Sequence, residues 1–219
     1  KSTLEAKGSG AATDLIPTLN ASAIAKSVKG DESDQVIAGF FARVNYDYKD
    51  RYLVSLSARY DGASNLGDDH KWGFFPGISV GWNVHNESFF DSSKVVNLLR
   101  LRASYGTVGS QNFSSYQALT TYRYFGQENY KYWNGAYMIG MGNPDLSWQK
   151  TKQLNLGVET SLFNGLVRFN VDFYNKLTND LLTDINLPTA AGFSSYKANV
   201  GEVRNRGVEL DATVFLIRN

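Results

Sequence analysis

The sequence predicts an all-β protein whose strands form an up-and-down antiparallel sheet, one segment of a transmembrane β-barrel. Apolar and polar residues alternate with period two in about seven segments from Val36 onward. Apolar residues make up 42% of the chain, with 13 Tyr and 13 Phe, yet the mean hydropathy is only -0.32. Apolar residues spread over alternate positions explain this, and no apolar run approaches the length of a spanning helix. The third observation is that short and long connections between the segments alternate.

The N-terminal segment differs from the rest of the chain. Residues 1–34 are rich in Gly, Ala, Ser, Thr and Lys and show no sustained period, so they are predicted to form an extracellular loop or irregular segment. Residues 35–219 are predicted to form a partial β-barrel. Because the chain begins without Met and ends inside an apolar strand pattern, we expect an internal piece of a longer protein.

Each expected strand has one apolar and one polar face. The strands are expected at about residues 36–48, 51–61, 74–84, 98–107, 148–162, 167–173 and 198–216. In this order their apolar faces include Val44, Tyr46; Val54, Leu56; Ile78, Val80; Leu99, Leu101; Leu156, Val158; Phe169, Val171; and Leu210, Val214. Their polar faces include Arg43, Asn45; Ser57, Arg59; Ser79, Asn83; Arg100, Arg102; Asn155, Glu159; Arg168, Asp172; and Glu209, Asp211. Ile37 and Phe41 interrupt the polar face of the first strand, and Pro76 is tolerable near a strand end.

Two connections are predicted to be tight hairpins. One is centred on Lys49 and places Tyr46 opposite Tyr52, with Asp50 able to adopt the left-handed conformation. The other is Asn164-Gly165, a strong hairpin signal, which places residue 162 opposite residue 167. The connections at 62–72, 108–147 and 182–197 are long. Short turns on one side and long loops on the other are typical of outer-membrane barrels, although the 85–97 link is long for its side.

Composition and motifs argue against several other functions. A net charge of +1 with interspersed signs gives no indication of a nucleic-acid partner. The absence of Cys excludes disulfides and thiol chemistry. The only His residues are His70 and His85, and no nucleophile motif accompanies them, so no enzymatic activity is expected. The loop over residues 61–69 offers carboxylates, but its spacing does not match an EF-hand, and no metal site or cofactor is predicted.

Two groups of residues are candidates for contact with a transported molecule. The charged residues expected on the polar face are Arg59, Arg100, Arg102, Arg168, Glu159, Asp172, Glu209 and Asp211. They either line a path for a polar substrate or pair with one another as a network that lines a wet lumen and holds a plug, and the second reading is favoured. An aromatic segment offers rings that suit a sugar face, a protein interface or an aromatic belt. Its candidate residues are Tyr122, Tyr124, Tyr130, Tyr132, Trp133, Asn134 and Tyr137.

Two neighbouring motifs carry a family resemblance: Arg59-Tyr-Asp-Gly-Ala-Ser-Asn-Leu-Gly and Trp72-Gly-Phe-Phe-Pro-Gly-Ile-Ser-Val-Gly-Trp82. They resemble the barrel of the SusC/RagA family of TonB-dependent outer-membrane transporters, in which Arg-Tyr-Asp-Gly-Ser-Ser, a short external loop and Trp-Gly-Phe-Phe-Pro-Ser follow one another. Further matches in family order are Asp50-Arg-Tyr52, Leu101-Arg-Ala-Ser-Tyr-Gly-Thr-Val-Gly109, Asn143-Pro-Asp-Leu-Ser-Trp148, Asn155-Leu-Gly157 and Asn205-Arg-Gly-Val-Glu-Leu210.

The resemblance implies both location and function. SusC/RagA-like proteins import oligosaccharides or peptides across the outer membrane of Gram-negative bacteria, powered by the TonB–ExbB–ExbD complex, under a SusD-like surface lipoprotein that acts as a lid. The chain would then be lipid-facing barrel wall with extracellular loops, about a third of a 22-strand barrel with a plugged lumen. The plug domain and TonB box are not in this sequence. A siderophore or cobalamin receptor and a soluble carbohydrate-binding β-sandwich remain as alternatives.

Overall fold

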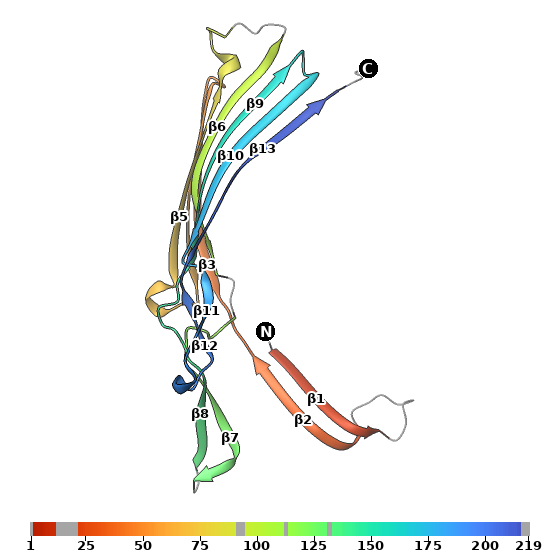
Figure 1. The fold of residues 1–219 in the computed structure, drawn as a ribbon, viewed down its shortest axis with the longest axis vertical. Coiled ribbons are helices and arrows are strands. Elements are labelled where there is room, and N and C mark those ends of the chain that lie inside the picture. Colours follow the sequence, from red (N-terminus) through yellow and green to blue (C-terminus); the bar gives the residue numbers. More distant parts are fainter. Residues whose placement is uncertain (1, 12–21, 91–94, 112–113, 131–132, 216–219) are drawn as a thin grey trace. The chain divides into compact units, whose positions relative to one another are not determined.

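The computed structural model describes residues 2–11, 22–90, 95–111, 114–130 and 133–215 (Figure 1). The chain divides into two units, Lys1–Val36 and Ile37–Asn219, each of which is described on its own. Among the described residues no helix is long and apolar enough to cross a membrane.

The first unit is a two-stranded antiparallel ribbon of β1 (Ser2–Ala11) and β2 (Ser22–Glu32), with a register shift between Lys7 and Gly8. The expectation of an irregular segment over residues 1–34 is therefore wrong in its secondary structure. The described side chains are mostly exposed, Leu4 at 80% among them. A ribbon held by main-chain hydrogen bonds with no buried face needs no apolar alternation, so the sequence carried no period-two signal.

The second unit is built on a seven-stranded antiparallel sheet, and the predicted all-β, up-and-down fold is confirmed (Figure 1). Its strands are β3 (Ile37–Tyr48), β4 (Tyr52–Ala63), β5 (Trp72–Asn83), β6 (Val96–Ser110), β9 (Gln149–Leu162), β10 (Val167–Asn179) and β13 (Glu202–Val214). Their order is β13-β10-β9-β6-β5-β4-β3, so every strand pairs with its neighbour in sequence once the inserted hairpins are set aside. All seven expected strands are present. A second sheet facing this one, as a β-sandwich requires, is absent from the described residues.

Two of the expected long loops contain strands. β7 (Thr121–Tyr130) and β8 (Trp133–Gly140) pair within the 108–147 connection, and β11 (Leu182–Asn186) and β12 (Ser195–Asn199) pair within the 182–197 connection. Both hairpins form small separate sheets. Short 3₁₀ turns occupy Asp68–His70, Val84–Asn86 and Thr189–Ala191.

The two tight turns test the predicted register. Leu162 lies opposite Val167, as the Asn164-Gly165 turn predicts. At the first turn Tyr48 lies opposite Tyr52, so the expected pairing of Tyr46 with Tyr52 is wrong by two residues. Lys49 and Asp50 both adopt positive φ, which places the turn one residue further along the chain than expected. An even shift leaves every side chain on its predicted face, so the assignment of faces is unaffected.

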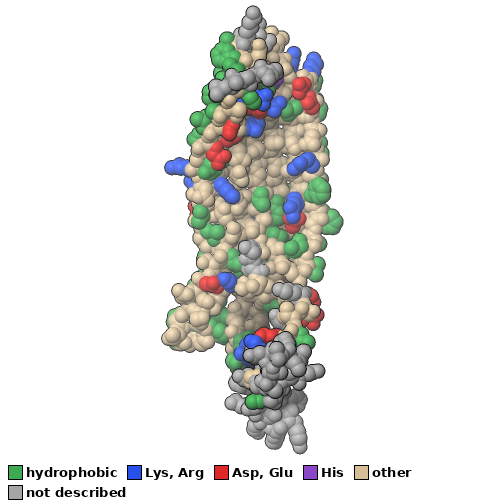
Figure 2. Space-filling view, turned by 90° about the vertical axis from the view of Figure 1, so that its right-hand side faces the viewer, with side chains coloured by type: hydrophobic (Ala, Val, Ile, Leu, Met, Phe, Trp, Pro, Cys, Tyr) green, Lys and Arg blue, Asp and Glu red, His purple; other side chains and the backbone are tan. Residues whose placement is uncertain are grey.

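The register divides the sheet into a polar face and an apolar face. All eight charged residues expected on the polar face share that side of the sheet, and the expected apolar residues share the other. On the apolar face the large hydrophobic side chains are exposed, Leu56 at 47% and Leu210 at 69% among them. In Figure 2 polar and charged side chains occupy the middle of the sheet, with hydrophobic ones toward its margins.

The apolar residues form a band that runs obliquely across the strands. On β5 the band extends from Trp82 to Trp72, and on β13 it extends from Val214 to Val208. Val208 lies in the same row across the sheet as Val80, so the band on β13 ends at a level that is close to the opposite border of the band on β5. The centre of the band thus shifts by about six residues, ~20 Å, over four strand spacings, ~19 Å. A band that is level in a membrane needs this offset when strands are tilted by about 45°, near the upper end of the range for outer-membrane barrels.

Aromatic pairs mark both borders of the band on β4 and β5. Tyr60 stacks on Trp72 with ring centroids 4.9 Å apart, and Tyr52 stacks on Trp82 at 6.5 Å. The two tryptophans are ten residues apart on β5, ~33 Å along the strand and about 24 Å in height at that tilt. This agrees with the ~25 Å apolar band between aromatic girdles that characterises such barrels.

A small core holds the long loops together. Leu146 is fully buried, and Trp148 packs edge-on against Phe75 with centroids 5.4 Å apart. The Leu146 carbonyl accepts a hydrogen bond from the Gly67 amide (2.9 Å), and the Trp148 indole donates to the Lys71 carbonyl (3.1 Å). The same segment joins the β11–β12 connection, because the Ser147 amide donates to the Asn199 side chain at 2.8 Å. The motif Asn143-Pro-Asp-Leu-Ser-Trp148 therefore ties three loops to one end of the sheet.

Candidate functional site

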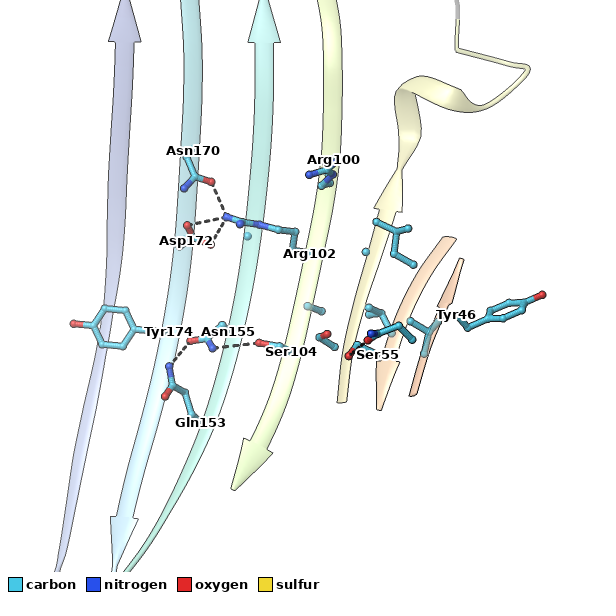
Figure 3. Close-up of a pocket in the computed structure, with 18 of the residues that line it drawn as sticks. Tyr46, Ser55, Arg100, Arg102, Ser104, Gln153, Asn155, Asn170, Asp172 and Tyr174 are labelled. Atoms are coloured by element: carbon cyan, nitrogen blue, oxygen red, sulfur yellow. Dashed lines mark hydrogen bonds and ion pairs between the residues drawn. The ribbon is translucent and has the colours of Figure 1, made fainter. Parts of the chain in front are cut away.

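The candidate site is the polar face of the seven-stranded sheet, which is hollowed along its length. Side chains from β3, β4, β5, β6, β9, β10 and β13 line the hollow, and most come from polar-face positions (Figure 3). The opposite face supplies few of its residues, Tyr46 and Val54 among them, and Tyr46 points away from the hollow in Figure 3. The period-two alternation seen in the sequence thus produces a largely hydrophilic surface over the middle of the sheet, whereas Ile37, Phe41 and Phe75 lie on the same face toward the long loops.

Arg102 on β6 is the most highly connected charge of this surface. Its guanidinium donates to the Asn170 side chain (2.8 Å) and to both oxygens of Asp172 (3.0 and 3.1 Å) on β10 (Figure 3). The side chain crosses β9 at Gly157, which lies in the row between Arg102 and Asp172. A Cβ on Gly157 would lie 2.3 Å from a carboxylate oxygen of Asp172, so only glycine leaves room for this bridge.

Arg100 makes the second charged bridge. Its Nε donates to the side-chain oxygen of Asn83 at 2.7 Å, and its terminal nitrogen lies 3.5 Å from Glu159. Asn83 is 1% exposed and donates in turn to the Asp50 carbonyl at 2.8 Å. Arg100 therefore connects the wall to the tight turn between β3 and β4.

Neutral groups fill the wall between and beyond these bridges. Gln153 donates to Asn155 at 2.9 Å, and Asn155 donates to the Ser104 hydroxyl at 3.2 Å. On the other side of the hollow the Ser55 hydroxyl donates to Asn45 at 2.7 Å. Amides and hydroxyls can exchange donors and acceptors with a polar ligand at little cost, unlike a charge that must give up its partner.

The remaining charged candidates lie on the same face but outside these two bridges. Arg59 pairs with Asp61 of its own strand at 2.6 Å, and Asp61 was not among the candidates. The Arg168 guanidinium lies 5.4 Å from the ring centre of Phe215. Glu209 and Asp211 are exposed, and they form no ion pair with the described residues. A second carboxylate of the 61–69 loop is engaged as well, since Asp68 pairs with Lys71 at 2.5 Å.

The aromatic candidates occupy the β7–β8 hairpin. Tyr122 and Tyr124 share one face of β7, where they are 58% and 73% exposed, and Tyr137 lies opposite Arg123 on the other face. The hairpin thus presents rings on both sides. Backbone pairing places Tyr130 opposite Trp133, and Asn134 pairs with the preceding residue of β7; nothing is described for their side chains. Tyr132 lies outside the described residues.

Sequence reasoning missed the neutral part of the wall and the polar cluster at the short-turn end. In that cluster the buried Glu87 accepts hydrogen bonds from the Trp82 indole (3.0 Å) and the Tyr52 hydroxyl, and lies 3.4 Å from Arg51. These contacts, led by the Tyr52 hydrogen bond, hold the pKa of Glu87 below its usual range. Through this cluster the first residues of the 84–96 link, as far as Glu87, fold back onto the end of the sheet instead of turning directly.

A tilted antiparallel sheet with a level apolar band outside and a hydrogen-bonded polar hollow inside defines a wall segment of an outer-membrane-type β-barrel. The family model described as "TonB dependent receptor-like, beta-barrel" matches residues 6–217. The chain belongs to this family, and the resemblance to SusC/RagA proteins is confirmed.

Individual relatives agree with this assignment. TonB-dependent receptor P39 of Formosa agariphila is 39% identical over 191 residues, 86% of this chain and 18% of that protein. TonB-dependent receptor SusC of Bacteroides thetaiotaomicron is 30% identical over 179 residues, 79% of this chain and 18% of SusC. The RagAB peptide importer in its closed-closed state superimposes with a TM-score of 0.85 at 28% identity, over 94% of this chain and 23% of that chain. The chain spans roughly a fifth of the length of these relatives.

Proposed function

We propose that the full-length protein imports oligosaccharides or peptides across the outer membrane of a Gram-negative bacterium in a TonB-dependent manner, together with a SusD-like surface lipoprotein. In this proposal the present chain is part of the barrel wall. Its apolar face contacts lipid and its polar face lines the lumen. Energy coupling to TonB–ExbB–ExbD belongs to parts of the protein outside this chain.

The separation of the two faces is the observation that carries this proposal. An oblique apolar band about 24 Å high fits a bilayer on one side. On the other side the charges of Arg100 and Arg102 are paired, and amides and hydroxyls remain between them. The part of this surface around the two bridges favours a neutral, hydroxyl-rich or amide-rich cargo over a highly charged one, because it offers hydrogen-bonding groups while its two arginines are already paired. The similarity to the RagAB peptide importer supports the amide-rich class of cargo.

We further propose an orientation for the wall. The tight turns at residues 49–51 and 163–166 face the periplasm, and the connections at 64–71, 111–148 and 180–201 reach the cell exterior. Residues 1–34 join β3 at the end of the sheet where Ile37 lies opposite Ala63, and they are assigned to the exterior as well. In intact cells a Ser64→Cys variant of the full-length protein should react with an impermeant thiol reagent, and a Lys49→Cys variant should not. The reverse pattern contradicts the orientation.

The transport itself is tested by uptake. A strain that lacks the full-length gene should lose uptake of one class of labelled oligosaccharide or peptide, and the wild-type gene should restore it only when TonB is present. Co-purification should recover a surface lipoprotein. Uptake that persists without TonB contradicts the proposal, and restoration of siderophore or cobalamin uptake instead would move the protein to another class of receptor.

The β7–β8 hairpin is proposed to contact the cargo or the lipoprotein lid. Its support is the exposure of Tyr122 and Tyr124 on one face of a hairpin that projects from a long loop. Loss of a buried aromatic contact by Ala substitution typically costs ~2 kcal/mol or more, roughly thirtyfold in affinity, when the ring is a hot spot. Replacing both residues with Ala should lower uptake or lid binding per folded transporter. Replacing Tyr60 of the aromatic girdle should lower only surface abundance. Unchanged uptake and lid binding after correction for abundance contradict the proposal.

A further inference from the structure

The apolar face carries charge at one corner only. Over all seven strands of the sheet, which the structure describes in full, its charged residues are Lys150, Lys152, Glu202, Arg204 and Arg206. All five lie on β9 and β13, at the end of these strands that leads to the long loops. Four of them are basic, so the corner is cationic.

The geometry places three of these cations together. Lys152 and Arg204 occupy the same row, separated by Leu177 of β10, and Arg206 lies one row closer to the apolar band, opposite Asn175. Two strand spacings separate β9 from β13, so the first two backbones lie ~10 Å apart. All three side chains are exposed and form no ion pair with the described residues. The acidic Glu202 is in the next row, which it shares with Lys150.

These cations follow the border of the oblique apolar band. Arg206 occupies the next position on this face beyond Val208, the last apolar residue of the band on β13, and Lys152 occupies the next position beyond Leu154 on β9. A charge at mid-bilayer is strongly unfavourable, whereas a long basic side chain at the border reaches the headgroup layer with its stem still in the apolar region. The corner is therefore positioned at headgroup level.

Two amides add hydrogen-bonding capacity to this corner. Asn175 and Asn179 of β10 lie on the same face, Asn175 opposite Arg206 of β13 and Asn179 opposite Lys150 of β9. Their side-chain oxygens are buried and have no hydrogen-bond partner among the described residues. A buried amide oxygen without a donor is costly, and a ligand that supplies hydroxyl groups would satisfy it.

We propose that this corner binds the phosphate-bearing, hydroxyl-rich headgroup of an outer-leaflet lipid. This inference rests on the proposed function, since it takes the apolar face to be embedded in the outer membrane and the long loops to be external. Lys152, Arg204 and Arg206 neutralise phosphate, and the Asn175 amide, once its side chain turns outward, hydrogen-bonds a headgroup hydroxyl. At the opposite end of the apolar face, at the tight turns, Arg51 is paired with Glu87 and Lys49 lies over the Tyr48 ring, and the strands themselves carry no charge on this face. The described residues thus offer no comparable group of unpaired cations there, so the proposed binding is confined to one leaflet.

The experiment uses the purified full-length protein, delipidated in a non-ionic detergent, with lipid binding followed by native mass spectrometry. The probes are bisphosphorylated lipid A, the same lipid without phosphates, and inorganic phosphate. The Lys152→Gln/Arg206→Gln variant is compared with a matched control, Arg43→Gln/Lys176→Gln, which removes two exposed cations from the polar face. At roughly fivefold per charge, the first variant should bind bisphosphorylated lipid A about 25-fold more weakly, and addition of Arg204→Gln should extend the loss to about 100-fold.

The control variant should bind lipid A as tightly as the wild-type protein does. The wild-type protein should bind the dephosphorylated lipid as weakly as the triple variant binds lipid A. Millimolar inorganic phosphate should not compete with lipid A. Equal lipid A binding by wild type and triple variant overturns the inference, as does phosphate-independent binding. Competition by inorganic phosphate would show a site for a free anion and not for a lipid. Heat-modified gel mobility verifies folding; if the multiple variants do not fold, Lys152→Gln alone should still show the fivefold loss. If TonB-dependent uptake is normal but lipid binding does not depend on the basic residues, only this inference is refuted. If lipid binding depends on them but no uptake is found, only the proposed import is refuted.

Discussion

The two faces of the seven-stranded sheet use the same backbone for opposite purposes. The polar face bridges strands through side chains, as Arg102 does from β6 across β9 to β10. The apolar face carries exposed hydrophobic residues such as Leu156, at 45% exposure. Its few charges lie in one corner. In the proposed orientation, adjacent residues of one strand therefore face an aqueous lumen and a hydrocarbon layer.

This difference shows where specificity is built. A lipid-facing position needs only to be apolar and of the right height, so many residues are acceptable there. A polar-face position has defined hydrogen-bond or ion-pair partners, and the neighbouring residues must leave room for them. Gly157 does so beneath the Arg102 side chain, where a Cβ atom would collide with Asp172. Substitutions should therefore be tolerated by different rules on the two faces.

The largest expected effect is a charge placed within the apolar band. Leu156→Arg puts a guanidinium near the middle of the band on β9, and it should destabilise the full-length barrel by roughly 2–4 kcal/mol. Ser79→Arg places the same group on the exposed polar face and should change stability by less than ~1 kcal/mol. Urea unfolding in lipid vesicles measures both. Equal costs for the two variants would show that the faces are not a lipid and an aqueous surface.

The sequence predicts the faces well because alternation is a local property, and register errors of two residues do not change it. The first turn illustrates this, since its pairing is displaced while Arg59 remains on the polar face. The apolar band and its tilt also follow from residue types once the register is known. Family motifs such as Trp72-Gly-Phe-Phe-Pro identify the barrel before any contact is seen.

The details of the polar face depend on contacts across strands that the sequence does not encode locally. Arg102 and Asp172 are 70 residues apart, and their pairing requires the β6–β9–β10 register and the glycine between them. The strands of unit 1 were missed for a different reason. A ribbon without a buried face leaves no hydrophobic pattern, and the same holds for the β7–β8 hairpin with rings on both sides.

The second prediction concerns this glycine. Gly157→Ala places a methyl group against the carboxylate of Asp172 and the Arg102 guanidinium, which must then separate. Overpacking of this kind typically costs 1–3 kcal/mol. The matched control is Gly106→Ala on the same face, where the nearest atoms would be 3.6 Å away, an ordinary contact. Thermal and urea unfolding of the two variants should differ by ~2 kcal/mol, and equal stability would contradict the Arg102 bridge.

The smallest expected effect is a change in pH dependence at the short-turn end. The hydrogen bonds from Tyr52 and Trp82, together with Arg51, lower the pKa of Glu87 below the usual 4.5. A pKa that is depressed in the folded state contributes stability above the unfolded value, and this contribution disappears as the pH falls through the folded value. The wild-type protein should therefore lose stability below about pH 4.5 more steeply than Glu87→Gln.

A control separates this effect from general acid denaturation. Asp211→Asn removes an exposed carboxylate on the polar face that forms no ion pair with the described residues, so its stability should follow the wild-type pH profile. For Glu87→Gln the stability difference from wild type should be greatest near neutral pH and should shrink as the pH falls, because protonated Glu87 and Gln make similar contacts. A difference that is constant from pH 7 to pH 3 would mean that Glu87 stabilises the 84–96 link through packing alone, and that its charge has no part in closing this end of the wall.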